Sequence, residues 1–423
     1  MAAINTHIET SRTRIGYQSA LGTASSNMRP ITLWGDDNPI GAMKRKTFPN
    51  NSQNQRRRVG RPPINGPRTG GEVKLPVCLR GIATALNASA TPNPFTHASA
   101  LPQQLLWRAV MGAELAPAAG STVAGSSGTP VTTVSVATGH GSRFVVGQII
   151  AIVMGGTLYP RRVTAVSTDD LTIVPPLPSA PSVGDVVRNA YNFHNGERDT
   201  TTFTVEHAQV EASGATTQRR AIGVHGGGEI TLPTNEVGSV TFSGTSVDHT
   251  DPSDLSISTD PTAELDGDPM VFTPTFYLMD TMTAAPSLAE IASVKIAVPR
   301  QWQEVPGSTV NGVGSVHEVA GRDAPITIEV EGLFDSAWWT AFESGTDYTF
   351  LGFTTYGSGT AARVVGFYAG KTHLQGTPEV TAMGKLVACK FTLVCETDTT
   401  IAGANPALST AEIRTANLIT FLA

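Results

Sequence analysis

The order of predicted elements in the first half of the chain is repeated in the second half. Each pass consists of a strand, a long loop, a strand, a short helix and three further strands. The first pass comprises 29–33, a loop over 35–70, 72–78, a helix near 101–111, 202–206, 217–232 and 239–247. The second comprises 293–298, a loop over 299–322, 325–331, a helix near 336–343, 348–354, 360–374 and 385–396. Two copies of one module in a chain are suited to a ring with quasi-equivalent positions.

The predicted fold class is mainly β. Apolar and polar residues alternate at 202–206, 240–242, 294–298 and 326–330. A period of two indicates antiparallel sheets with one buried face and one solvated face. The abundance of Gly and Pro, with only 6% aromatic residues, also favours short strands and many turns over helical bundles. We therefore expect two tandem β-sandwich or barrel modules, each with one short helix.

An insertion interrupts the first module. It begins with a Gly/Ser/Thr-rich linker over 119–129 and continues with five short predicted strands between 131 and 188. These strands predict a small five-stranded barrel. Insertions between strands lie on the surface, so we expect this barrel to face outward.

A length of 423 residues suggests two or three domains. The predicted division is an N-terminal arm (1–28), a discontinuous first module (29–117 and 192–250), the inserted barrel (118–191), an acidic linker (251–289), a second module (290–397) and a C-terminal tail (398–423). Ser409 and Glu412 have the spacing of a capping box, so the tail is expected to be a short helix or a segment that docks on a neighbour.

Charge is unevenly distributed along the chain. The net charge of −6 combines +8 on residues 38–70, which include no acidic residue, with −14 on the rest. We expect the basic loop to meet the acidic segment on a neighbouring copy, although a solvated loop or a nucleic-acid arm would have the same composition. The candidate residues for this contact, which we expect between stacked rings, are Lys44, Arg45, Lys46, Arg56, Arg57, Arg58 and Arg61 on the basic side, and Asp251, Asp254, Asp260, Asp266 and Asp268 on the acidic side.

No motif predicts a catalytic, cofactor or metal site. Residues 366–372 resemble a phosphate loop, but only three residues separate the glycines where the motif needs four. Cys78, Cys389 and Cys395 form no CxxC pair and are expected to be packing thiols. No apolar run reaches the ~20 residues of a membrane helix, and no apolar signal segment follows Met1, so we expect a cytoplasmic origin.

Several segments resemble the tail tube proteins of long-tailed, siphovirus-like bacteriophages. TRIGYQSALGT at 13–23, followed by ITL at 31–33, is similar to that family's N-terminal arm and first strand. The family's strand-then-helix step and its central sheet resemble GEVKL (71–75), LLWRAVMG (105–112), DTTTFTVE (199–206), RAIGVH (220–225) and GSVTFSG (238–244). The doubled module and the inserted barrel depart from the simplest members of the family.

The resemblance implies a structural virion protein with no catalytic residues. Such a chain polymerises as stacked rings into a hollow tail tube through which genomic DNA passes at ejection. Its partners would be other copies of itself, the tape-measure protein and phage DNA in the lumen, and tail terminator and distal tail proteins at the ends, with no membrane. It would reside in the virion tail after assembly in the bacterial cytoplasm. Two modules per chain favour a trimeric, pseudo-sixfold ring, with a hexamer as the alternative.

Two other functions remain open from the sequence. The first is another virion component, such as a tail terminator, baseplate or capsid protein with a basic interaction loop. The second is an enzyme on a β scaffold, such as a glycan hydrolase, for which Glu206 and Glu229 are the carboxylates to test. The acidic balance outside the basic loop suits a tube lumen that repels DNA phosphates.

Overall fold

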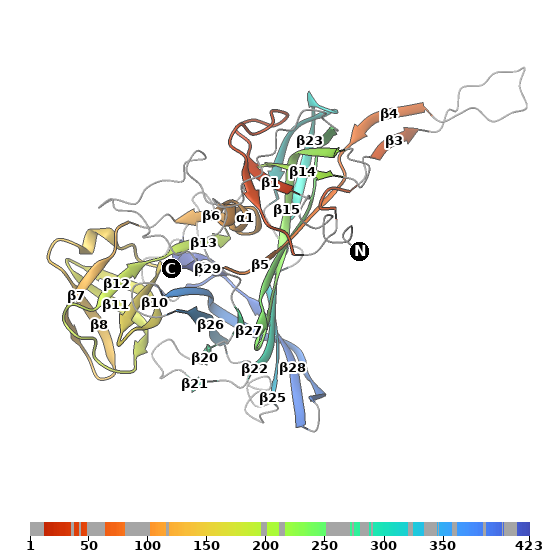
Figure 1. Ribbon diagram of the computed structural model, residues 1–423. Coiled ribbons are helices and arrows are strands. Elements are labelled where there is room, and N and C mark those ends of the chain that lie inside the picture. Colours follow the sequence, from red (N-terminus) through yellow and green to blue (C-terminus); the bar gives the residue numbers. More distant parts are fainter. Residues whose placement is uncertain are drawn as a thin grey trace, which may run out of the picture.

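The computed structural model confirms a mainly β fold, in which every strand pairing is antiparallel (Figure 1). The second predicted helix, near 336–343, lies outside the described residues. The structure describes residues 12–34, 38–41, 44–48, 64–80, 102–115, 118–195, 201–210, 216–250, 271–272, 275–279, 287–288, 291–319, 325–333, 345, 347–357, 362–383, 386–399, 401 and 413–423.

Two series of strands share one pairing order. The first runs β5–β17–β15–β14–β1–β2, and the second runs β25–β28–β27–β26–β20–β21. The first series comprises β1 (Arg12–Tyr17), β2 (Arg29–Ile31), β5 (Glu72–Cys78), β14 (Phe203–Val210), β15 (Thr216–Pro233) and β17 (Ser239–Thr245). The second comprises β20 (Thr275–Met279), β21 (Ser287–Leu288), β25 (Thr327–Leu333), β26 (Asp347–Tyr356), β27 (Arg363–Met383) and β28 (Leu386–Cys395). The strands predicted after the long loop of each pass are therefore repeated in the hydrogen bonding. The first predicted strands of the two passes are not counterparts, because 29–33 contains β2, which pairs with β1, whereas 293–298 lies in β22 (Ile291–Val298), which pairs with β15 and β25.

The long strands β15 and β27 each serve two partners. The first part of β15 pairs with β14, and its second part pairs with β17. In the same way β27 pairs first with β26 and then with β28. A further strand lies on the far side of each first part: β18 (Asp248–Thr250) beside β15, and β29 (Ile419–Leu422) beside β27. The sequence predicted that the second of these long strands ends at residue 374, but it continues to Met383 through a bulge between Gln375 and Glu379.

The helix α1 (Pro102–Met111) lies in the main core. Pro102 occupies its first position, and Gly112 follows it with a φ of 103°, which residues with a side chain rarely adopt. Its Val110 packs against β15 at Gly228, where an added Cβ would lie 2.7 Å from Val110 Cγ1. The glycine run in β15 thus permits the close backbone approach that its position in a strand suggests.

The insertion is a closed barrel of six strands rather than five. The additional strand, β7, forms from the Gly/Ser/Thr-rich segment that the sequence assigned to a linker, because Val123 turns into the barrel core. The strands are β7 (Ser121–Ser127), β8 (Val131–Val136), β9 (Ile149–Met154), β10 (Thr157–Ser167), β11 (Asp170–Leu177) and β12 (Val186–Asn189).

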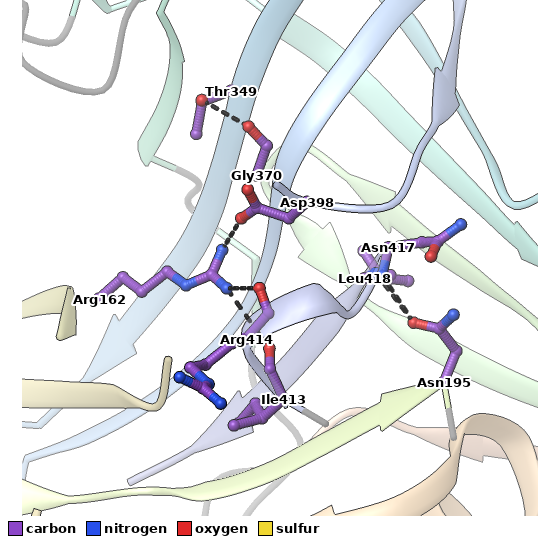
Figure 2. Close-up of polar contacts among 9 residues, drawn as sticks. All are labelled: Arg162, Asn195, Thr349, Gly370, Asp398, Ile413, Arg414, Asn417 and Leu418. Atoms are coloured by element: carbon purple, nitrogen blue, oxygen red, sulfur yellow. Dashed lines mark hydrogen bonds and ion pairs between the residues drawn. The ribbon is translucent and has the colours of Figure 1, made fainter. Parts of the chain in front are cut away.

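The barrel is joined to the second series of strands by a buried polar lock (Figure 2). Arg162 on β10 forms an ion pair with Asp398, and both side chains are fully buried. The same guanidinium donates to the carbonyl of Arg414 at 2.9 Å and lies 4.7 Å from the ring of Tyr368 on β27. An apolar cluster that combines barrel residues with Leu351, Phe353 and Phe421 surrounds this lock.

Several segments that the sequence did not assign to strands contain them, and the predicted acidic linker, for example, contains β20 and β21. Part of the predicted N-terminal arm forms β1. The two predicted long loops each contain a hairpin: β3 (Lys44–Phe48) with β4 (Ile64–Thr69), and β23 (Trp302–Val310) with β24 (Val313–Glu318). The end of the predicted tail forms a short 3-10 turn (Ile413–Thr415) and then β29, which lies between β27 and β13 (Tyr191–Asn195) of the same chain.

Candidate assembly surface: two sheet edges

One strand joins the two series within the chain. The strand β22 (Ile291–Val298) pairs with the second part of β15 on one side and with β25 on the other. Ile296 on β22 lies opposite Ile230 and Ile328, and all three side chains are fully buried. The result is a continuous run of seven strands, β5–β17–β15–β22–β25–β28–β27.

Matching hydrogen bonds fix the correspondence between the two halves. Ser246 donates its backbone N–H to the carbonyl of Gly71 at 3.0 Å, and Cys395 donates to Ile326 at 2.9 Å. The next residues repeat the pattern, since Val247 donates to Ile222 and Glu396 donates to Lys371. The second part of β27 therefore corresponds to the second part of β15.

The second part of β27 forms the trailing edge of the seven-strand run. It pairs with β28 on one side, and no strand in the described part of the chain pairs with its other side. Val380 lies opposite Cys389 as Ile230 lies opposite Val240. Ile230 is fully buried, whereas Val380 is 56% exposed. Among the described residues, no strand takes beside β27 the position that β22 occupies beside β15.

The leading edge of the run is the segment 38–41, next to β5. Ile40 forms a β-bridge with Val73, and the backbone of Gly41 donates to the carbonyl of Glu72 at 2.8 Å. This segment is placed beside β5 as β22 is placed beside β25. Among the described residues, no strand pairs with its outer side. Trp34, which donates its backbone N–H to the carbonyl of Pro76 on β5 at 2.8 Å, is 54% exposed.

The run presents one apolar face and one polar face. The apolar face packs into the main core through residues such as Leu75, Ile230 and Val330. On the polar face Lys295 pairs with Glu229 at 2.8 Å, and Lys390 pairs with Glu329 at 3.1 Å. These exposed pairs add little stability, but they place charge on a solvated surface that crosses both halves of the chain.

The predicted contact residues are only partly within the described chain. Lys44, Arg45 and Lys46 lie on β3, where Arg45 is opposite Arg68 on β4. A contact between the basic and acidic sets remains a prediction. The other predicted residues lie outside the described residues: Arg56, Arg57, Arg58, Arg61, Asp251, Asp254, Asp260, Asp266 and Asp268.

The two carboxylates considered for catalysis have structural partners. Glu206 is 2% exposed and bonds Arg14 and Arg220, each at 2.7 Å. Glu229 belongs to an exposed ion pair on the polar face. The segment that resembles a phosphate loop runs straight through β27, without a turn into a helix. In the described residues, His, Cys, Asp and Glu side chains form no group of three that could hold a metal ion.

Burial shifts the pKa values of several groups in the core. It raises the pKa of Glu114 to about 7, although Gln104 donates to this carboxyl group at 2.5 Å. It lowers the pKa of His194 to about 4, and the pKa of Cys395 is raised for the same reason. The three cysteines are free and buried, as the sequence predicted. These groups act in packing, and none of them lies at the two edges.

The sequence did not reveal the trailing edge. The predicted strand ends at residue 374, and Gly376 and Pro378 after it are residue types typical of turns. The alternation of apolar and polar residues that resumes after Pro378 was the available signal.

Among the described residues, no helix has the length and apolar character needed to cross a membrane. Comparison with protein-family models and with curated proteins finds no match to this chain.

Proposed function

We propose that this chain is a structural protein that closes into rings, which stack into the hollow tail tube of a siphovirus-like phage. One observation carries the proposal: β22 fills an edge of β15 within the chain, while no strand among the described residues fills the corresponding edge of β27. A chain that joins its own two modules in this way has the parts to join the next copy in the same way.

In the proposed ring, the segment 38–41 of one copy pairs with the second part of β27 in the next copy. Ile40 then covers Val380 as Ile296 covers Ile230, and Trp34 lies near the exposed Val387. This head-to-tail contact is heterologous, and it leaves no unpaired edge only if the ring closes. Three chains of two modules give a pseudo-sixfold ring, which we favour over a hexamer.

The polar face of the seven-strand run supports a role as a channel wall. Its apolar side is already buried, so the polar side is the one that remains for an aqueous lumen. This face is not uniformly basic, because it includes the acidic residues Glu72, Glu329 and Glu331. Phosphates would therefore not adhere to it. Phage DNA and the tape-measure protein are the proposed occupants, with terminator and distal tail proteins at the two ends.

Negative-stain microscopy of the purified chain, with averaging of end views, tests this proposal. We expect hollow tubes or rings with three outer projections, one from each six-stranded barrel. Six equal projections would keep the tube function and show a hexamer instead. Closed shells would point to a capsid component, and single unstacked rings would point to a terminator or baseplate protein. Monomers at all concentrations, with and without a preassembled tail tip, would overturn the proposal.

A further inference from the structure

The hairpin β23–β24 clasps the first module of its own chain. Trp302 donates its indole N–H to the carbonyl of Gly226 at 2.9 Å, and its ring lies 5.5 Å from that of His225. Val313 and Val316 pack against Val247. This hairpin directly follows β22 in the chain. The strand that joins the two modules is therefore continued by the hairpin that packs on the first module.

The corresponding surface of the second module is uncovered. Glu396 takes the place of Val247, and His373 lies opposite Val394 as His225 lies opposite Thr245. Val247 and His225 are buried, at 2% and 5% exposed. The side chains of Glu396 and His373 are 39% and 38% exposed.

The hairpin β3–β4 has the same place in the first module as β23–β24 has in the second. It comes between the edge segment 38–41 and β5, as β23–β24 comes between β22 and β25. It pairs with no other strand among the described residues, and it projects from the body on the side opposite the six-stranded barrel (Figure 1). Its partner surface is therefore to be sought on another molecule.

We infer that the β3–β4 hairpin of one copy lies over the second module of the neighbouring copy, at His373 and Glu396. The inference rests on the proposed ring, because pairing of segment 38–41 with β27 brings the hairpin to that surface. The intrachain clasp is apolar, whereas the interchain clasp joins a hairpin rich in Lys and Arg to a surface that includes Asp347 and Glu396. Lys371 lies between these two carboxylates, 2.8 Å from Glu396 and 3.5 Å from Asp347, and leaves the surface acidic.

Disulfide cross-linking tests the contact. The full chain with Lys46→Cys and His373→Cys should form dimers and trimers on oxidation, visible without reductant on a denaturing gel. The native cysteines are buried and should not react. The matched control combines Lys46→Cys with Val183→Cys, a 77% exposed residue of the barrel, and should not form these species.

The outcomes separate the clasp from the ring. Rings in the microscope without cross-links in the first pair would overturn the clasp and leave the proposed function standing. Equal cross-linking in both pairs would also overturn it, because the contact would then be unspecific. Absence of rings and of cross-links would overturn both proposals together.

Charge removal gives a second test that needs no new cysteine. Replacing Lys44, Arg45 and Lys46 with Ser should weaken ring association roughly tenfold at low salt, with the difference shrinking as salt rises. Replacing Lys74, on the polar face of β5, with Ser is the control and should leave association unchanged. Equal association of both variants at low salt would contradict the inference.

Discussion

The second parts of β15 and β27 are counterparts in two different surroundings. In β15 this part is paired on both sides, by β17 and β22, and Ile230 is fully buried. In β27 the only strand that pairs with it among the described residues is β28, and Val380 is largely exposed. Two corresponding strand segments of one molecule thus differ in whether a second neighbouring strand of the described chain pairs with them.

The trailing edge of β27 also has features that protect an edge strand from pairing unspecifically with strands of other molecules. The trailing edge of β27 carries a bulge between Gln375 and Glu379, and Gly376 within it has a φ of 71°. Register shifts of this kind and charged residues such as Glu379 are common protections of edge strands. The filled edge of β15 has no shift where it pairs with β17 and β22.

The largest effect is expected when a charged side chain is introduced at the two corresponding positions, 230 and 380. Ile230→Asp should destabilise the folded chain by about 5 kcal/mol, because it removes buried apolar area and buries an unpaired charge. Val380→Asp should leave the unfolding free energy of the monomer almost unchanged but abolish ring formation. Denaturant unfolding and sedimentation measure the two effects. Equal destabilisation by both variants would show that β27 is covered within the monomer.

The next effect concerns the joint between β22 and its hairpin. Arg300 bonds Glu318 at 2.7 Å, and both side chains are almost fully buried. Arg300→Ala should cost about 3–5 kcal/mol, because Glu318 is left buried without its cation. Thermal unfolding measures this loss, and Arg300→Ala with Glu318→Gln should recover part of it. A loss below about 1 kcal/mol in the single variant would show that the pair does not hold the hairpin.

A smaller effect depends on pH. Burial lowers the pKa of His225 below its ordinary value of 6.5, against the opposing influence of Glu304. As pH falls through 6.5 the unfolded chain takes up this proton before the folded chain, so stability is lost on the acidic side. His225→Gln should remove that part of the dependence, at most about 1.4 kcal/mol for each pH unit.

Measuring the free energy of unfolding of His225→Gln and of the wild type between pH 7.5 and 5 tests this prediction. The exposed counterpart, His373→Gln, is the control, and its curve should run closer to that of the wild type. If the slope of the unfolding free energy against pH is the same in His225→Gln as in the wild type, this buried histidine is not the source of the predicted loss of stability at acidic pH.

The smallest effect is expected on the polar face. Lys390→Ala removes an exposed pair with Glu329 and should change stability by less than about 1 kcal/mol. If the face lines a channel, tubes of this variant should still form with unchanged diameter in the microscope. Loss of tube formation would show that this face makes contacts between copies.

The repeated plan was predictable because it depends on local alternation and order. Alternation of apolar and polar residues predicts strands such as 202–206 and 326–330. A proline at its first position and a glycine after its last predict the helix α1. The hairpins in the two long loops were not predicted, since β23 is largely exposed and has no regular apolar face. The barrel strand β7 was missed because its Gly and Ser residues resemble a linker, and only the closed barrel gives Val123 a place to pack.

The candidate surface was less predictable than the fold. Which edge stays open depends on the partner that fills it, and β22 lies more than 50 residues after β15 in the sequence. The charge of the basic loop is visible in the sequence, but the proposal that its hairpin lies over a neighbouring copy depends on the position of β23–β24 in the structure. Pairing between distant strands is a tertiary property that no local pattern specifies.

The lock between Arg162 and Asp398 has a mechanical consequence. A barrel tethered by flexible linkers would swing independently and dissipate any pull applied to it. Here Arg162 also lies against the ring of Tyr368 on β27. It donates to the carbonyl of Arg414, a few residues before β29, so a rotation of the barrel would have to break these contacts (Figure 2). A load on the barrel would therefore reach β27, the strand whose second part forms the trailing edge.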